Sequence, residues 1–247
     1  MKGARDPVGC TPHTPRYSLA FHKHTPFGHC VGVWLPPAEA CLDVVVDGRL
    51  TPAEQAHAAT MMPRRRVCWM GGRIALREAF ARGATTCGDI LSGPRGAPDV
   101  PPDCTASISH KARLAVALVD SVERGRVGVD VEDLEPARLG IVRLVLRDGE
   151  RALVESVAPE QKWFETVLRF STKEALYKAL DPYVNRYVAF HEAEVIPQPD
   201  GTCVVTLSLV KGEGPFEIDA AWERWTDFVL TYVRVRESTA FVRPQPD

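Results

Sequence analysis

The chain has 247 residues, of which 45% are hydrophobic and 25% are charged, and its formal net charge is -2. This hydrophobic content is enough for one large core or two smaller ones, and it excludes an intrinsically disordered protein. A net charge close to zero excludes the overall basic field with which a protein binds nucleic acid or acidic membranes. Any anionic ligand must therefore meet a local cluster of cations.

Seven cysteines are scattered along the chain and never form a CxxC pair. Their odd number and irregular spacing argue against a disulfide framework and against a cysteine-rich zinc site. The first residues lack the apolar core of a signal peptide, and the longest apolar run, 114–119, is too short to cross a bilayer. We therefore expect a soluble protein of the reducing cytoplasm, with neither nucleic acid nor a membrane as partner.

The N-terminal part combines an irregular segment with predicted strands and a helix start. Residues 1–28 are rich in Pro, His and Thr without periodicity, so we expect an irregular arm. Short apolar runs at 30–35 and 42–46 predict two strands. The sequence TPAE at 51–54 has the pattern of a capping box, with a threonine N-cap, proline at the first helical position and glutamate three residues after the cap. A short helix is therefore predicted to follow.

A second helix is predicted at 64–82, and its first turn is rich in arginine. Arginines in a first turn oppose the helix dipole unless an anion lies nearby. Arg65, Trp69 and Arg73 are spaced at four and eight residues and share one helical face. This face is either a solvated basic surface or a phosphate-binding surface, since guanidinium groups match phosphate oxygens in shape and charge.

The segment 92–105 is a Gly/Pro-rich loop without the glycine pattern of the common nucleotide-binding motifs. Two strands are predicted after it, at 105–109 and 114–119, joined by a tight turn. Ser109 and His110 then lie at a strand end, where side chains can face a cleft. A hydroxyl and an imidazole at a turn are by themselves weak evidence, because such groups usually make local hydrogen bonds.

The stretch 126–132, RVGVDVE, alternates valines with Gly128, Asp130 and Glu132. As a strand it presents both carboxylates on one face, while we expect the valines to pack into the core of the second half. Residues two apart on a strand are roughly 7 Å apart, which suits carboxylates that share a divalent cation. Taken alone, the pattern also fits an edge strand with a solvated polar face.

A long helix is predicted at 163–180, because this segment contains strong helix formers and no glycine or proline. It places Phe170, Glu174 and Lys178 on one stripe. Asp130, Glu132 and Glu174 can then complete an oxygen site for Mg²⁺, an ion that takes its remaining ligands from water and phosphate. Together with the nearby cations, such a site implies phosphoryl transfer.

Both halves of the chain combine helices with antiparallel strands, so we predict an α+β class. The boundary is placed between residues 1–126 and 127–247. The remaining predicted elements are helices at 137–146 and 149–157 and strands at 188–196, 203–209, 216–225 and 228–235.

Three motifs together resemble a known family. SISHK at 107–111, GVDVE at 128–132 and FSTKEALYKAL at 170–180 resemble the Sfp-type 4′-phosphopantetheinyl transferases of the enterobactin-synthase type, and the arginine-rich helix also fits. In that family, two similar α+β halves form a pseudo-twofold monomer that holds coenzyme A and Mg²⁺ between them. The resemblance therefore implies two pseudo-symmetric halves with antiparallel sheets and a ligand cleft between them.

The resemblance also implies a reaction and residue roles. The enzyme would move the phosphopantetheinyl arm of coenzyme A onto a serine of an apo acyl or peptidyl carrier protein of polyketide, nonribosomal peptide, siderophore or fatty-acid synthesis, releasing adenosine 3′,5′-bisphosphate. Asp130, Glu132 and Glu174 would bind Mg²⁺, and Glu174 would also deprotonate the serine. The implied phosphate contacts are Lys178 and Lys173 at the pyrophosphate and Arg65, Arg73, Arg95, Ser109 and His110 at the nucleotide.

Some positions depart from the family pattern. Ala97 stands where many relatives have lysine or glutamate just before proline, and Val100 where they have tryptophan, so only Arg95 remains in that loop as a phosphate contact. Phe170 stands where many relatives have tryptophan, although phenylalanine is common in the enterobactin-type group. The arginine run lies one residue further from Arg73 than usual, which leaves open whether Arg64, Arg65 or Arg66 faces the ligand. The sequence does not name the carrier protein.

Two other classes of protein remain open at this point. A Mg²⁺-dependent nuclease or phosphatase also uses strand carboxylates and a lysine, but nucleases usually place lysine two positions after the glutamate, where Leu134 stands. The other alternative is a non-catalytic module that binds carrier proteins. Against that module, clustered carboxylates without a metal would repel one another.

Overall fold

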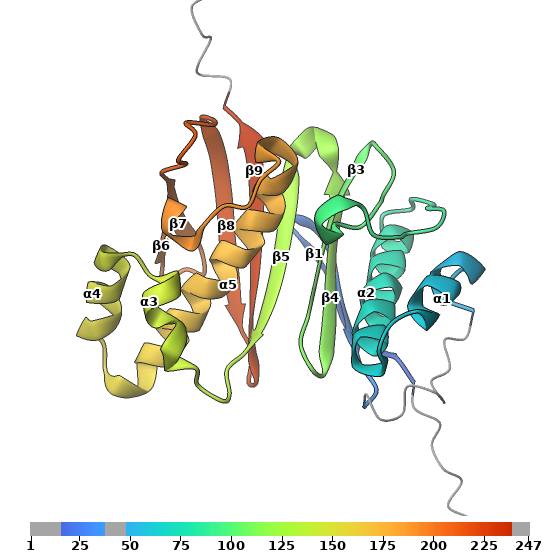
Figure 1. Cartoon of the computed structure of the whole chain (residues 1–247), viewed down its shortest axis with the longest axis horizontal. Coiled ribbons are helices and arrows are strands. Elements are labelled where there is room, and N and C mark those ends of the chain that lie inside the picture. Colours follow the sequence, from blue (N-terminus) through green and yellow to red (C-terminus); the bar gives the residue numbers. More distant parts are fainter. Residues whose placement is uncertain (1–15, 38–47, 239–247) are drawn as a thin grey trace, which may run out of the picture.

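The computed structural model describes residues 16–37 and 48–238, and it combines helices with antiparallel sheets, which confirms the predicted α+β class (Figure 1). A four-stranded sheet has the order β1-β2-β4-β3, a three-stranded sheet the order β5-β9-β8, and β6 pairs with β7. The strands are β1 (Ser18–Thr25), β2 (Gly28–Trp34), β3 (Cys104–His110), β4 (Leu114–Ser121), β5 (Arg126–Asp133), β6 (Ala193–Pro197), β7 (Cys203–Leu207), β8 (Phe216–Arg224) and β9 (Phe228–Glu237).

The predicted capping box begins helix α1 (Pro52–Ala59). The Thr51 hydroxyl accepts the Glu54 N–H at 3.2 Å, and the Glu54 carboxylate accepts the Thr51 N–H at 3.0 Å. Fully buried Glu54 also pairs with Arg77 of α2 (Pro63–Arg82) at 2.7 Å. Glu54 of the capping box therefore also fixes α1 against α2.

Two long helices cover the outer faces of the two larger sheets, which pack against each other in the middle of the molecule (Figure 1). Helix α2 packs on β2 and β4, and α5 (Pro159–Val184) packs on β5 and β9. Val127, Val129 and Val131 lie between the sheets, in one cluster with Leu118 of β4 and Leu230 of β9. The expected packing of these valines against the second half is therefore present, and the same cluster also joins the two sheets.

Strand β3 supplies hydrogen bonds to β5, which is the edge strand of its sheet. The Val127 N–H donates to Thr105 Oγ1 at 3.1 Å, and the Val129 N–H donates to Ser107 Oγ at 3.0 Å. Hydroxyls at alternate positions of β3 therefore satisfy backbone groups that a sheet edge would leave unpaired. This contact fixes the position of the carboxylate strand relative to the end of β3.

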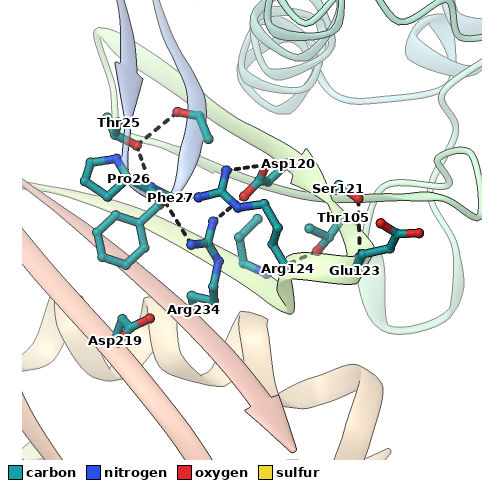
Figure 2. A network of polar contacts seen from close by, with 12 residues as sticks. Thr25, Pro26, Phe27, Thr105, Asp120, Ser121, Glu123, Arg124, Asp219 and Arg234 are labelled. Atoms are coloured by element: carbon teal, nitrogen blue, oxygen red, sulfur yellow. Dashed lines mark hydrogen bonds and ion pairs between the residues drawn. The ribbon is translucent and has the colours of Figure 1, made fainter.

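A buried ionic network also joins the two sheets (Figure 2). Arg234 of β9 pairs with Asp120 of β4 and donates to the Pro26 carbonyl at 2.9 Å. Arg124 contacts the same two groups, Asp120 at 3.2 Å and the Pro26 carbonyl at 3.0 Å. Asp120 therefore neutralises two guanidinium groups, and the Arg234 side chain is only 7% exposed.

Replacing Asp120 by Asn should lower the free energy of unfolding by about 3 kcal/mol, because it leaves a buried guanidinium without its counter-charge. Urea denaturation measures this change. The matched control is Asp219→Asn, whose exposed carboxylate pairs with Arg236 at 2.8 Å, and there we expect a loss below about 1 kcal/mol. Equal losses in the two variants would contradict the prediction.

Some predicted elements were wrong or differ in extent. Residues 18–25, expected to be irregular, form strand β1, whose polar, histidine-rich sequence shows little alternation because it lies at a sheet edge. The helix predicted at 137–146 is reduced to a 3₁₀ turn (Leu139–Ile141) and α3 (Val142–Val145), whereas α4 (Asp148–Ser156) agrees with its prediction. The strand predicted at 42–46 lies outside the described residues. Among the helices described, none is long and apolar enough to cross a membrane.

Candidate active site

The three carboxylates predicted to bind a metal come from two elements in close contact. Asp130 and Glu132 share the face of β5 that meets α5, the helix that carries Glu174. Helix α5 can lie close to β5 because Gly128 has no side chain: a Cβ there would lie 1.8 Å from the Ala175 carbonyl oxygen. Burial, and after it the negative charge of Asp130, raises the pKa of Glu174. The carboxylates of Asp130 and Glu174 are therefore near enough to repel each other.

Asp130 is the most firmly held of the three carboxylates. Its Oδ1 accepts hydrogen bonds from Ser109 Oγ and from Lys178 Nζ, both at 2.7 Å, and its Oδ2 accepts one from Ser171 Oγ at 2.9 Å. Ser171 also contacts Thr231 Oγ1 at 2.9 Å. These partners, drawn from two strands and a helix, fix the direction of the carboxylate.

Glu132 is paired with Lys111, whose Nζ lies 2.6 Å from Glu132 Oε1. Burial and the neighbouring Asp130 raise the pKa of Glu132 to about 7, although the ammonium of Lys111 opposes the shift. Lys111 and Ser171 were not among the predicted site residues. Both lie inside the motifs SISHK and FSTKEA, and Ser171 is one helical turn before Glu174, so the helical period alone could have indicated it.

Several positive charges act on His110 at the end of β3. Burial lowers the pKa of His110, and the positive charges of Lys178, Lys111 and Arg65 lower it further. Arg66, in contrast, donates to the carbonyls of Ala58 at 3.1 Å and of its neighbours at the end of α1. Of these two arginines, Arg65 is exposed and its charge acts on His110, whereas Arg66 bonds to the end of α1.

Lys173 pairs with a buried acid in this structure, and its contact with the pyrophosphate stays a prediction. Its Nζ is 2.6 Å from the carboxylate of Glu150 and donates to the Val145 carbonyl at 2.9 Å. Both charged side chains are buried, and burial lowers the pKa of Lys173. Successive residues of a helix are rotated by about 100°, so the neighbour of Glu174 faces the helix α4 instead.

Arg73 is also engaged within the fold. It is buried, stacks on Trp69 at 4.2 Å, and donates to the carbonyls of Ile90 at 3.1 Å and Leu91 at 2.9 Å. Burial lowers the pKa of Arg73 to about 10. The donors of Arg73 hold the loop that follows α2 in this structure, and its contact with the nucleotide stays a prediction.

Two further predicted phosphate contacts have protein partners. The Ser109 hydroxyl donates to Asp130, and its contact with phosphate stays a prediction. Arg95 pairs with Asp181 at 2.7 Å and donates to the Asn185 side chain at 3.1 Å, which connects the Gly/Pro-rich loop to α5. The Arg95 side chain remains 41% exposed, and its contact with phosphate stays a prediction.

The site fits Mg²⁺ in the chemistry of its donors, since carboxylate oxygens are the ligands this ion prefers. As the side chains stand, residues 16–37 and 48–238 contain no group of three His, Cys, Asp or Glu side chains that could hold a metal ion. The ammonium groups of Lys111 and Lys178 form ion pairs with the carboxylates of Glu132 and Asp130, respectively. Binding of a cation therefore requires a rearrangement of these ion pairs.

Comparisons with known proteins identify the family. The profile of the 4′-phosphopantetheinyl transferase superfamily matches residues 126–233, and that of the 4′-phosphopantetheinyl transferase N-terminal domain matches residues 53–120. The chain is 30% identical to 4′-phosphopantetheinyl transferase Svp of Streptomyces mobaraensis over 182 residues, which cover 71% of this chain and 73% of the relative. The chain belongs to the 4′-phosphopantetheinyl transferase superfamily.

Other relatives agree with this assignment. The chain is 30% identical to 4′-phosphopantetheinyl transferase Npt of Nocardia iowensis, over 62% of this chain and 69% of that one. A holo-(acyl-carrier-protein) synthase from Bacillus anthracis, solved in complex with CoA, is 19% identical with a TM-score of 0.39, over 47% of this chain and 97% of the other. The two sequence relatives carry the family membership of this chain.

Proposed function

We propose that this protein transfers the phosphopantetheinyl arm of coenzyme A to a serine hydroxyl of an apo carrier protein and releases adenosine 3′,5′-bisphosphate. The observation that carries the proposal is the meeting of the carboxylates Asp130, Glu132 and Glu174 with the cations Lys111 and Lys178 where the two sheets join. Phosphoryl transfer depends mainly on positioning and on neutralising charge, and these groups supply both.

Each residue has a defined part in this proposal. Asp130, Glu132 and Glu174 would hold Mg²⁺, which when bound neutralises pyrophosphate charge. Lys178 adds positive charge beside the pyrophosphate, while His110 and Arg65 bind the nucleotide phosphates. Glu174 accepts the proton of the serine hydroxyl, directly or through a water molecule.

The proposal extends to the organisation and setting of the protein. The two halves, 1–126 and 127–247, meet at β3 and β5, where the site lies, and we propose that they are pseudo-symmetric domains of a monomer. The cysteines that fall within the described residues are all free, which supports a reducing cytoplasm. The carrier proteins would belong to polyketide, nonribosomal peptide, siderophore or fatty-acid synthesis.

Intact-mass spectrometry tests the proposal. The protein is incubated with coenzyme A, Mg²⁺ and an apo carrier protein, and we expect the carrier to gain the mass of one phosphopantetheinyl group. A carrier with its acceptor serine changed to alanine is the control and should gain nothing. If none of several acyl and peptidyl carriers is modified, the proposal is wrong.

Neighbouring arginines at the start of α2 provide a test of the phosphate contacts. Arg65→Ala should raise the KM for coenzyme A about tenfold with little change in stability, because it removes one charged contact with phosphate. Arg66→Ala should lower the free energy of unfolding by about 1 kcal/mol, through its lost bonds to α1, and leave KM unchanged. Steady-state kinetics and thermal unfolding of both variants measure these effects; the reverse pattern would assign the ligand to Arg66.

A further inference from the structure

We propose that Lys111 is an internal counter-ion of Glu132 and that it leaves Glu132 when coenzyme A binds. The divalent cation and coenzyme A would therefore bind cooperatively. This inference rests on the proposed function, because it concerns the same site. The Lys111 and Glu132 side chains are 24% and 10% exposed, and their charged atoms are 2.6 Å apart. A cation that binds through Glu132 must therefore first displace an ammonium group that already neutralises it.

The two lysines of the site are held differently. Lys178 projects from the long helix α5 and donates both to Asp130 Oδ1 at 2.7 Å and to the Val129 carbonyl at 2.9 Å. Lys111 lies in the turn between β3 and β4, and within the described residues Glu132 is the one acceptor for its ammonium group. Since Lys111 would give up one contact and Lys178 two, Lys111 is the lysine that a ligand displaces more easily.

An anionic ligand would offer Lys111 a new partner close by. His110 precedes it in the chain, and Lys178 pairs with Asp130, two residues before Glu132 on β5, so these basic groups form one cluster beside the carboxylates. A pyrophosphate bound to this cluster would accept the Lys111 ammonium and leave Glu132 to the cation. By linkage, the cation and coenzyme A must then raise each other's affinity by the same factor.

The test uses Mn²⁺ as the probe and measures free Mn²⁺ by electron paramagnetic resonance, with and without coenzyme A. Coenzyme A should lower the Kd for Mn²⁺ of the wild-type protein at least tenfold. Without coenzyme A, Lys111→Met should lower the Kd for Mn²⁺ about fivefold, the factor that corresponds to one partly exposed ion pair. In this variant coenzyme A should also lower the Kd for Mn²⁺ by a smaller factor than in the wild-type protein. Lys111→Arg, which keeps the charge, should restore the wild-type pattern.

Arg113→Met is the matched control, since Arg113 lies in the same turn, is exposed, and pairs with Asp227 at 3.1 Å. This variant changes the net charge by the same amount as Lys111→Met but leaves Glu132 paired. Its Kd for Mn²⁺, measured with and without coenzyme A, should therefore stay within twofold of wild type. The inference is overturned if Lys111→Met binds Mn²⁺ no more tightly than wild type, or if Arg113→Met has the same effect. If coenzyme A binds but leaves the Kd for Mn²⁺ unchanged, this inference is wrong and the proposed function stands. If coenzyme A does not bind at all, both the inference and the proposed function are wrong.

Discussion

Replacing Glu174 by Gln should slow phosphopantetheinyl transfer about a thousandfold while the protein stays folded. The amide cannot accept the proton of the serine hydroxyl and is a weaker ligand for Mg²⁺ than a carboxylate. The loss should appear in kcat, measured by the rate of mass gain of the carrier protein at saturating coenzyme A. Because α5 keeps its packing on β5 and β9, circular dichroism should be unchanged.

The same variant should be more stable than wild type at neutral pH. Burial and Asp130 raise the pKa of Glu174 in the folded protein above its ordinary value of 4.5, so the ionised carboxylate costs free energy of folding at higher pH. This cost disappears as the pH falls below 4.5, where the carboxyl is protonated in both states. The gain in Tm of Glu174→Gln should therefore shrink toward acidic pH.

Glu160→Gln is the matched control for both measurements, since Glu160 lies exposed in the first turn of the same helix. It should leave kcat unchanged and lower stability by a few tenths of a kcal/mol, because it removes a favourable charge at the helix N-terminus. If Glu174→Gln kept a rate within threefold of wild type, the assignment of Glu174 as base and metal ligand would be wrong.

Replacing Gly128 by Ala should destabilise the protein by more than about 4 kcal/mol or prevent folding. The added Cβ would lie 1.8 Å from the Ala175 carbonyl oxygen and 3.2 Å from the Ala179 nitrogen. Both atoms belong to the backbone of α5, so no side-chain rotation relieves the clash. The helix would have to move away from β5, which would break the bonds of Lys178 to that strand.

Urea denaturation measures the stability of the Gly128→Ala variant, and isothermal titration measures its binding of coenzyme A, which should be lost. Gly88→Ala is the control, because a Cβ at Gly88 has no other heavy atom within 4 Å. That change should alter stability by less than about 0.5 kcal/mol. A Gly128→Ala protein as stable as the control would show that β5 and α5 are not packed as closely as described.

Much of the candidate site could be predicted from local sequence. The alternation in RVGVDVE placed Asp130 and Glu132 on one face, and the helical period placed Glu174 and Lys178 on one stripe; both elements form as predicted. The capping box was readable because its hydrogen bonds join residues three apart. Contacts between residues this close in the sequence follow from the local backbone geometry, which neighbouring residues determine.

The protein partners of single cations could not be predicted in this way. Lys173 and Arg73 lie in the right motifs, yet the first pairs with buried Glu150 and the second holds the loop at Ile90 and Leu91. A guanidinium or ammonium group pairs with whichever acceptor the packed fold places nearest, and burial makes such pairing necessary. Motif membership therefore does not decide which cations remain available to a ligand.

The sequence by itself determined the α+β class, the motifs and the face of each carboxylate, because these follow from composition and from the periods of strands and helices. Only the tertiary structure decided how the parts meet. The hydroxyls of Thr105 and Ser107 hold β3 against the edge of β5, and Gly128 lets α5 approach that strand. These contacts join segments more than 20 residues apart, so local patterns cannot specify them, and they bring SISHK, GVDVE and FSTKEA together in one site.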